Sequence, residues 1–374
     1  MTIKQIDDDK ASWAADQFID YFQNFTNLEE YLRHVKKSVV TKSSILDDPK
    51  DDFFNQDIHP NDMEFDIRLV GDRFQNGIPQ DYYRNLLSSV SSHNNEDNIP
   101  GRELRMMIYE KNTNKVVGFI RLQSPLINSK PRNLWLGKAP DLKIFNRHAV
   151  MGFAIVPTQP FGYNYLGGKL LALICISHFM REKLNEVFEK DIALFETTSL
   201  YGSSSSSSQY DGLKPYMRYK GLTMSDFTPL LHDDVFKGLN KWFIARNNDK
   251  LLVKEDASSR KLKTQQKMIS IIKKNSSSQK AAEFQTAIAN AKNLTEKKRV
   301  YFSDYGFANS REVIRGDTDK LEKNPINFDK FYQENLIKWW KNKASKRYES
   351  LKSSGSLRTE LEVWTKDMHI DIIR

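Results

Sequence analysis

The stretch RELRMMIYEKNTNKVVGFIRLQSP, residues 102–125, has the clearest secondary-structure pattern in the chain. Apolar residues alternate with polar or opposite-face residues on both sides of KNTNK, whose asparagines favour a turn. The alternating residues are Leu104, Met106, Ile108, Val116, Gly118 and Ile120. This period of two predicts a β-hairpin.

The segments that follow the hairpin predict a mixed sheet. HAVMGFAIVP, residues 148–157, is nearly apolar throughout, as a strand buried on both faces is. Helical spacing covers residues 167–188, and a second short buried strand is expected at residues 192–200. Residues 213–231 predict a short helix that stops at Gly221, then a further strand or loop. This order of elements predicts an α/β fold with a mixed central sheet.

Composition divides the chain into three regions. Residues 1–100 are expected to be mostly helical, because residues 13–40 place their large apolar side chains on roughly one helix face. Residues 101–232 form the predicted α/β core, and residues 233–374 form a basic helical region. A length of 374 residues fits two or three domains.

The last third of the chain carries all of the positive charge excess. The chain has a net charge of +9, and residues 251–374 hold 26 Lys and Arg against 16 Asp and Glu. Such asymmetry indicates a polyanionic partner, most often nucleic acid, because basic side chains near phosphates release condensed counterions. The alternative is a solvated basic surface. We therefore expect DNA as a partner.

Cysteine usage and the first residues predict a reduced intracellular protein. The single cysteine, Cys175, cannot form an intrachain disulfide or a cysteine-rich zinc site. The start MTIKQIDDDK lacks the basic end and apolar stretch of a signal peptide, and no apolar run approaches 18 residues. We expect no membrane partner, and the sequence does not indicate an oligomeric state.

The segment VPTQPFGYNYLGG, residues 156–168, places glycines before a predicted helix. Glycine lets the backbone approach a phosphate closely, and backbone amides and the helix dipole then supply a positive field. The same residues also suit a simple turn. The pattern alone leaves both interpretations open.

The order of elements over residues 102–228 resembles the GNAT acyltransferase superfamily. In that superfamily the loop reads Gln/Arg-x-x-Gly-x-Gly/Ala and its amides hold the pyrophosphate of acetyl-CoA. Gln159 and Gly162 match this pattern, whereas Asn164 stands where glycine or alanine is expected. The resemblance implies that Gln159, Gly162, Gly167 and Gly168 bind acetyl-CoA or another acyl donor.

Within that superfamily the chain is similar to divergent Mom-type and DruA-type proteins of phages and anti-phage systems. The similarity lies in FNRHAVMGFAIVP, residues 145–157, and in LFETTSLYGSSSSSSQYDGLKPYMRYKGL, residues 194–222. Mom-type proteins modify adenine in DNA, and DruA-type proteins belong to defence systems. The resemblance implies DNA modification in the cytoplasm of a bacterial or infected bacterial cell.

Glu196 is the first candidate for a catalytic residue. It lies inside an apolar strand, where desolvation would raise its pKa toward that of a general base. The alternative is a structural glutamate bonded to backbone amides. Tyr201 or Tyr210 could protonate a leaving thiolate, although the rings of such tyrosines more often pack against the protein while their hydroxyls contact water. Asp211, beside the run of serines, completes the candidate set.

The candidate DNA contacts are basic side chains. Arg147 could clamp a phosphate, or it could be an ordinary surface arginine. Trp339, Trp340, Tyr301 and Phe302 offer stacking surfaces if they are exposed, whereas paired tryptophans on an amphipathic helix are more often core. The other predicted contacts are Lys261, Lys267, Lys273, Lys274, Lys297, Lys298, Arg299, Lys343, Lys346 and Arg347.

These observations favour a DNA-modifying GNAT-like transferase. An amino group of a base would attack an acyl carbon while Glu196 removes a proton. One alternative is a nucleic-acid-binding defence or counter-defence protein without catalysis. Another is a metal-dependent nuclease that uses Glu196, Asp211 and either Asp233 or Asp234, although the scattered histidines and the capping pattern at residues 232–234 predict no metal site.

Overall fold

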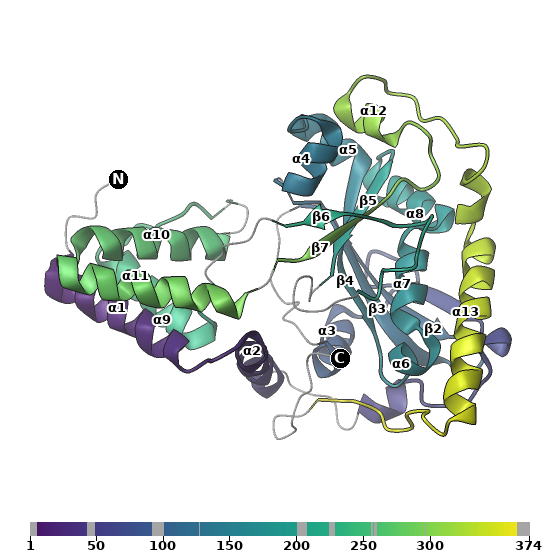
Figure 1. Ribbon diagram of the computed structural model, residues 1–374, viewed down its shortest axis with the longest axis horizontal. Helices are drawn as coiled ribbons and strands as arrows, with labels where there is room; N and C mark the ends of the chain where they lie inside the picture. The colour runs from purple at the N-terminus through teal and green to yellow at the C-terminus, as the bar shows by residue number, and fades with distance from the viewer. Residues whose placement is uncertain are drawn as a thin grey trace.

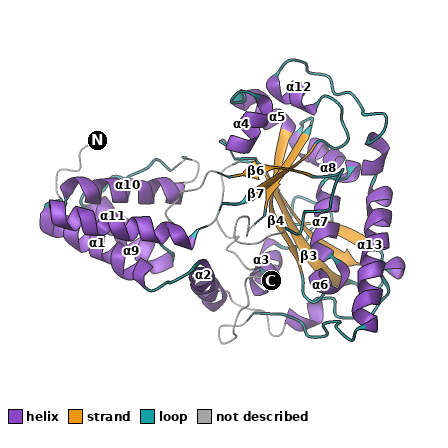
Figure 2. Ribbon diagram, in the orientation of Figure 1, coloured by secondary structure: helices purple, strands orange, loops and turns teal. Residues whose placement is uncertain are grey.

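A mixed seven-stranded β-sheet organises the larger part of the protein (Figure 1 and Figure 2). The computed structural model describes residues 6–42, 49–91, 101–126, 128–199, 208–223, 229–255, 257, 260–295 and 297–364. The strands are β1 Phe65–Leu69, β2 Glu103–Glu110, β3 Lys115–Gln123, β4 Ala149–Pro157, β5 Leu194–Thr198, β6 Arg218–Leu222 and β7 Arg299–Ser303. The α/β fold class with a mixed sheet is thus confirmed.

The sheet order is β1-β2-β3-β4-β5-β7-β6. Strands β4 and β5 run parallel, and the other neighbouring pairs run antiparallel. The predicted hairpin is the β2–β3 pair, in which Glu103 faces Gln123 and Glu110 faces Lys115. Asn114 adopts a left-handed backbone with φ of 56° in the turn, a conformation that asparagine tolerates better than most residues.

Helices cover both faces of the sheet. One face packs against α6 Phe161–Tyr165, α7 Gly167–Cys175, α8 His178–Phe188 and α13 Gln333–Ser353 through a large apolar core. The opposite face is covered by α3 Gln80–Val90 beside β1 to β4. The same face is covered by α4 Lys130–Leu136, α5 Leu142–His148 and α12 Ser310–Arg315 beside β5 and β7. The two apolar clusters on this second face leave a polar stretch of sheet between them.

A separate helical bundle has its own apolar core (Figure 1). It contains α1 Asp8–Gln23, α2 Leu28–Lys42, α9 Asp233–Ala245, α10 Arg260–Asn275 and α11 Ser278–Ala291. Its last three helices lie in sequence between β6 and β7, which are neighbours in the sheet. Short 3-10 helices, η1 Pro49–Asp52, η2 Pro60–Asp62, η3 Lys292–Leu294 and η4 Phe328–Phe331, lie in connecting segments.

The sheet draws strands from all three regions that composition separates. Strand β1 comes from the region before residue 101, and β7 comes from the region after residue 233, which the sequence pattern presents as helical. β7 is only five residues long and pairs with β5 and β6 from the core region. A strand this short leaves little periodic signal among the long helices around it.

Two local expectations need correction. The helix expected over residues 167–188 is two helices, because the Ser177 hydroxyl accepts a hydrogen bond from the Met180 amide and starts α8. The helix expected before Gly221 is a turn followed by β6, and Gly221 lies inside this strand with φ of 128°, beside a register shift. Glycine alone adopts that backbone conformation readily.

The segment after α13 crosses the glycine loop and reaches α3. The Arg358 amide donates to Asn164 Oδ1 (3.0 Å), and Asn164 Nδ2 donates back to the Arg358 carbonyl (2.8 Å). The Trp364 amide donates to the Ser89 carbonyl in α3 (2.7 Å). Among the described residues, no helix is both long and apolar enough to cross a membrane.

Candidate functional site

A cleft of about 1000 Å³ opens on the polar stretch of the sheet between the two apolar clusters. Its floor includes Gln123, Met151 and Glu196, which lie on three adjacent strands and directly oppose one another in the register. Directly opposed residues point to the same face of a sheet, so these three side chains form one row. Residues 124–126 and 128–139, which include α4, supply one wall, and Leu262 and Lys263 of α10 lie at the cleft.

Glu196 is buried in this cleft and forms an ion pair with Arg132. Arg132 Nη1 donates to Glu196 Oε1 (2.8 Å), and Arg132 Nη2 donates to the Leu126 carbonyl (2.8 Å). The guanidinium also lies 4.0 Å from the ring centre of Phe145. The second oxygen of Glu196, Oε2, is buried with no hydrogen-bond partner in the described part of the chain.

Burial raises the pKa of the Glu196 carboxyl, and the charge and hydrogen bond of Arg132 oppose that shift. A carboxyl in such a setting accepts and releases protons closer to neutral pH than an exposed glutamate does. The ion pair also fixes the carboxylate, because Arg132 holds Oε1 while Oε2 is buried without a partner among the described residues. A catalytic role for Glu196 stays a prediction, but its position fits one.

Gln123 is a site residue that the sequence reasoning missed. It ends β3 and is 3% exposed, and neither its amide oxygen nor its amide nitrogen has a hydrogen-bond partner among the described residues. Leaving buried polar atoms unpaired costs free energy, so such atoms in a cleft wall point to a ligand. The available signal was a glutamine at the end of a mostly apolar strand.

Three lysines give the cleft a positive rim. Lys130 is the first residue of α4, Lys138 follows α4, and Lys263 comes from α10; all three are exposed and line the cleft. Lys130 and Lys138 lie outside the basic last third of the chain, and Arg132 lies between them. Sequence reasoning therefore missed them by following the charge excess alone.

Tyr210 and Asp211 do not share this cleft. Tyr210 is buried on the other face of the sheet, where its ring centre lies 5.4 Å from that of Tyr301. Burial raises the pKa of Tyr210, and the sheet separates it from the Glu196 carboxylate. The expected pairing of Tyr210 as acid with Glu196 as base is thereby corrected. Tyr201 lies outside the described residues.

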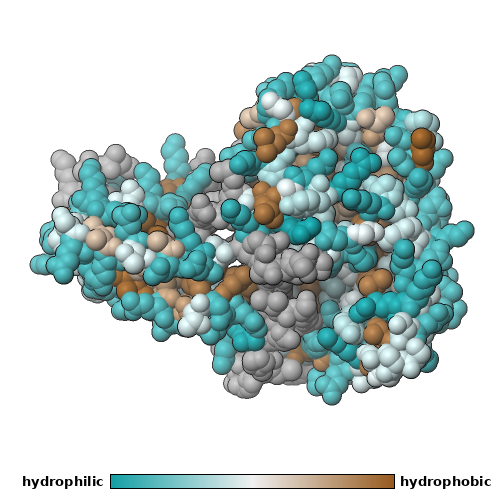
Figure 3. All heavy atoms as spheres, viewed as in Figure 1, coloured by the Kyte–Doolittle hydropathy of each residue, from teal (hydrophilic) through white to brown (hydrophobic). Residues whose placement is uncertain are grey.

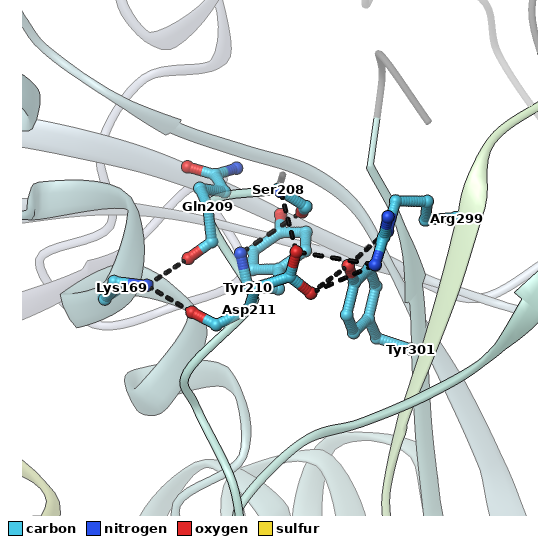
Figure 4. Close-up of polar contacts among 7 residues, drawn as sticks. All are labelled: Lys169, Ser208, Gln209, Tyr210, Asp211, Arg299 and Tyr301. Atoms are coloured by element: carbon cyan, nitrogen blue, oxygen red, sulfur yellow. Dashed lines mark hydrogen bonds and ion pairs between the residues drawn. The ribbon is translucent and has the colours of Figure 1, made fainter. Parts of the chain in front are cut away.

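The Asp211 side chain connects Ser208 to two residues of β7, Tyr301 and Arg299 (Figure 4). It accepts hydrogen bonds from the Tyr301 hydroxyl (2.8 Å) and the Ser208 amide (2.9 Å), and it pairs with Arg299 (3.5 Å). Burial acts to raise the pKa of Asp211, but these hydrogen bonds and the nearby positive charges outweigh it, so the pKa is lowered. A carboxylate so engaged serves structure rather than proton transfer.

The glycine loop forms a turn in which several backbone amides donate hydrogen bonds within the loop. The Gly162 amide donates to the Thr158 carbonyl (2.7 Å), the Tyr163 amide to Gln159 Oε1 (3.0 Å) and the Asn164 amide to the Pro160 carbonyl (2.9 Å). The hydrogen atoms of these three amides are therefore already bonded to oxygen atoms of the protein. The expected acyl donor stays a prediction, but these bonds do not favour the loop as its site.

Each loop glycine accommodates a neighbouring side chain. A methyl group on Gly162 would meet Gln159 at 2.5 Å, one on Gly167 would meet the Phe161 ring at 2.6 Å, and one on Gly168 would meet Gln209 at 1.9 Å. The close approach that glycine permits is thus to protein atoms rather than to phosphate. This packing gives a physical reason for all three glycines.

Helix α13 covers the loop with residues that were expected to contact DNA. Trp340 is fully buried and donates from its indole nitrogen to the Tyr165 carbonyl (2.9 Å). Arg347 donates to the Tyr163 carbonyl (2.6 Å) and lies over the Tyr163 ring. Tyr301 and Phe302 are also buried, so stacking on unpaired bases is excluded for them and for Trp340.

The remaining predicted DNA contacts do not gather on one surface. Helix α10 lies in the bundle at one end of the molecule, and α13 lies at the opposite end (Figure 1). Arg299 is engaged with Asp211 and Tyr301, whereas Arg147 is exposed on α5. Figure 3 shows a largely hydrophilic surface on the viewed face, with small separate apolar spots. The other exposed lysines are Lys267, Lys273 and Lys274 on α10, Lys297 and Lys298 before β7, and Lys343 and Lys346 on α13, while Lys261 is half-buried.

The described residues do not form the carboxylate cluster that the nuclease alternative requires. In the described part of the chain, no group of three histidine, cysteine, aspartate or glutamate side chains lies close enough to hold a metal ion. Glu196 pairs with Arg132 and Asp211 pairs with Arg299, while Asp234 belongs to the helical bundle. The side chain of Asp233 lies outside the described set.

Comparison with known proteins identifies a family. No curated protein and no solved structure matches the chain. The family model described as "Druantia protein DruA" matches residues 16–207, just over half of the sequence. The match includes Gln123, Arg132 and Glu196. The chain therefore belongs to the DruA family, which places it in the context of anti-phage defence.

Proposed function

We propose that this protein modifies nucleic acid in anti-phage defence, with Glu196 as the general base of the cleft. The observation that carries this proposal is the Glu196 carboxylate, held by Arg132 at one oxygen and unpartnered at the other, which is buried in the cleft. A fixed carboxylate with one available oxygen is suited to remove a proton from a bound amino group.

The lysine rim supports nucleic acid as the substrate. Lys130, Lys138 and Lys263 would contact phosphates on either side of a base that enters the cleft. A base inside a duplex cannot reach a buried carboxylate, so the substrate is single-stranded or has its base flipped out. The cleft volume lies at the upper end of the usual range for small-molecule sites, which leaves room for a base and a second reactant.

The proposed reaction is the acyl transfer that the GNAT resemblance implies. The amino nitrogen forms a bond to the acyl carbon of a thioester such as acetyl-CoA, Glu196 Oε2 accepts a proton from the nitrogen, and the thiolate leaves. A mixed sheet whose single parallel pair is β4–β5 supports a GNAT-like relationship. The Gly162, Tyr163 and Asn164 amides are bonded within the chain and do not support a donor site at that part of the loop.

A non-catalytic nucleic-acid-binding protein is the second candidate function. The internal bonding of the glycine loop favours it, since this candidate requires no donor site. Both candidates use the lysine rim, whereas only the transferase uses the carboxylate. Substitutions at the two features therefore distinguish them.

The test compares Glu196→Gln with Glu186→Gln in cells that carry the complete defence system. Glu186 is exposed on α8, far from the cleft, so it provides a matched control. We expect Glu196→Gln to abolish phage protection and any mass shift of DNA nucleosides, while the purified variant still binds single-stranded DNA. Full protection by Glu196→Gln would reject the catalytic role.

A lysine variant completes the comparison. Lys130→Gln combined with Lys138→Gln should weaken binding of single-stranded DNA. It should also reduce the salt dependence of the binding constant by the amount that about two phosphate contacts contribute. Lys330→Gln with Lys338→Gln, at two exposed lysines of η4 and α13 that are not among the predicted DNA contacts, is the control. Loss of protection in the Lys130 and Lys138 variant, with normal protection in Glu196→Gln, would favour the non-catalytic candidate.

A further inference from the structure

On the floor of the cleft lie three buried hydrogen-bonding atoms without a partner in the described structure, and a fourth, Asn133 Oδ1, lies on the α4 wall. The three atoms of the floor are the amide nitrogen and amide oxygen of Gln123 and the Oε2 atom of Glu196. Gln123 is 3% exposed and Glu196 is 4% exposed, so water reaches these atoms poorly. Two of them accept hydrogen bonds, and the Gln123 nitrogen donates.

The spacing of the strands leaves room for a flat ligand between the two polar side chains. Gln123 and Glu196 lie on β3 and β5, on either side of Met151 in β4. Neighbouring strands are about 4.8 Å apart, which separates the two backbones by about 10 Å. The apolar Met151 side chain forms the floor between the two polar side chains and offers a polarizable surface for an aromatic ring.

We infer that the cleft binds a nucleobase that presents the unit N=C–NH2 on its Watson–Crick edge, as adenine and cytosine do. The Gln123 nitrogen donates to the ring nitrogen of this unit, and the Gln123 oxygen accepts one hydrogen of the amino group. Glu196 Oε2 accepts the second hydrogen of the amino group. One such unit satisfies all three unpartnered atoms of the floor, and this assignment of substrate rests on the proposed function.

Thymine, uracil and hypoxanthine are excluded by the same geometry. Each has a carbonyl oxygen where adenine or cytosine has the amino group. That oxygen would face the Glu196 carboxylate, and two acceptors without a shared proton repel each other. Glutamine that binds adenine through two hydrogen bonds, and a carboxylate that accepts from the cytosine amino group, are known forms of base recognition.

The experiment uses pairs of nucleotides that differ only at this position. The purified full-length protein is titrated calorimetrically with dAMP against dIMP and with dCMP against dUMP. We expect the amino form of at least one pair to bind about tenfold more tightly or better, as two-bond base recognition provides. Equal binding within both pairs would overturn the inference, as would the absence of binding by all four nucleotides at millimolar concentration.

Two variants test the roles of the named atoms. Gln123→Met keeps the shape of the side chain and removes both polar atoms, so the amino preference should fall severalfold or more while the melting temperature does not decrease. A purely structural glutamine would instead lose stability and keep the preference. Gln75→Met, at an exposed turn, is the matched control and should change neither.

Glu196→Gln should reverse the preference. Arg132 holds the oxygen at the Oε1 position, so the new amide nitrogen would face the cleft and donate to a carbonyl oxygen. We therefore expect this variant to bind dIMP or dUMP more tightly than the amino partner. An unchanged preference for the amino form would contradict the assignment of Oε2.

The outcomes separate this inference from the proposed function. If Glu196→Gln loses protection and the Lys130 and Lys138 variant loses DNA binding while nucleotide pairs bind equally, the inference fails and the proposed function stands. If the amino preference is present but Glu196→Gln protects fully, base recognition stands and the proposed catalysis fails.

Discussion

Replacing Arg132 by methionine should leave a buried negative charge without its partner. Arg132 and Glu196 are both almost completely buried, and their side chains meet at 2.8 Å. Removing one member of a buried ion pair costs about 3–5 kcal/mol of unfolding free energy. Arg132→Met also loses the hydrogen bond to the Leu126 carbonyl and the contact with the Phe145 ring.

The double variant Arg132→Met with Glu196→Gln isolates the effect of the charge. It loses the same contacts to Leu126 and Phe145 but leaves no unpaired carboxylate. We expect it to be more stable than the single variant by about 2 kcal/mol or more at neutral pH. Urea denaturation of the two variants, followed by fluorescence, measures this difference directly.

The pH dependence gives a second check with a definite sign. Burial already raises the pKa of Glu196, and without Arg132 nothing in the ion pair opposes that rise. A carboxyl whose folded pKa lies above its unfolded value of about 4.3 binds more protons in the folded state, so stability falls as pH increases between the two values. The single variant should lose stability from about pH 4 upward relative to the double variant. Equal stability of both variants at every pH would refute the idea of a buried, paired carboxylate.

Two further predictions concern the loop and Asp211. Gly167→Ala should lower the free energy of unfolding by about 1–3 kcal/mol, because the new methyl group meets the buried Phe161 ring. Gly168→Ala should lower it less, because only the end of the Gln209 side chain must move. Urea denaturation that ranks the two variants the other way round would contradict this explanation. Asp211→Asn should lower the melting temperature by more at pH 7 than at pH 3. The lowered folded pKa of Asp211 stabilises the fold above the unfolded pKa of about 3.9, and this contribution is lost as pH falls through the folded pKa. A difference that stays constant with pH would show that the Asp211 charge is unimportant.

Glu196 shows how far sequence reasoning reaches into the site. An apolar strand with one carboxylate predicts burial and a raised pKa; Glu196 is buried, and this burial raises the pKa of its carboxyl. Its partner Arg132 lies 64 positions earlier in the chain, in helix α4, and no local sequence pattern links the two residues. The same limit applies to Gln123, which joins the site through the register of β3, β4 and β5.

The sequence by itself determined the hairpin, the buried strands and the amphipathic helices, because the spacing of apolar residues within a segment reflects which of its faces is buried. It also determined membership of the DruA family. Tertiary structure alone decided that β7 completes the sheet, that the glycine loop packs against α13, and that Gln123, Met151 and Glu196 share one cleft. These outcomes depend on contacts between distant segments, whose free energies are set by packing and register rather than by any local run of residues.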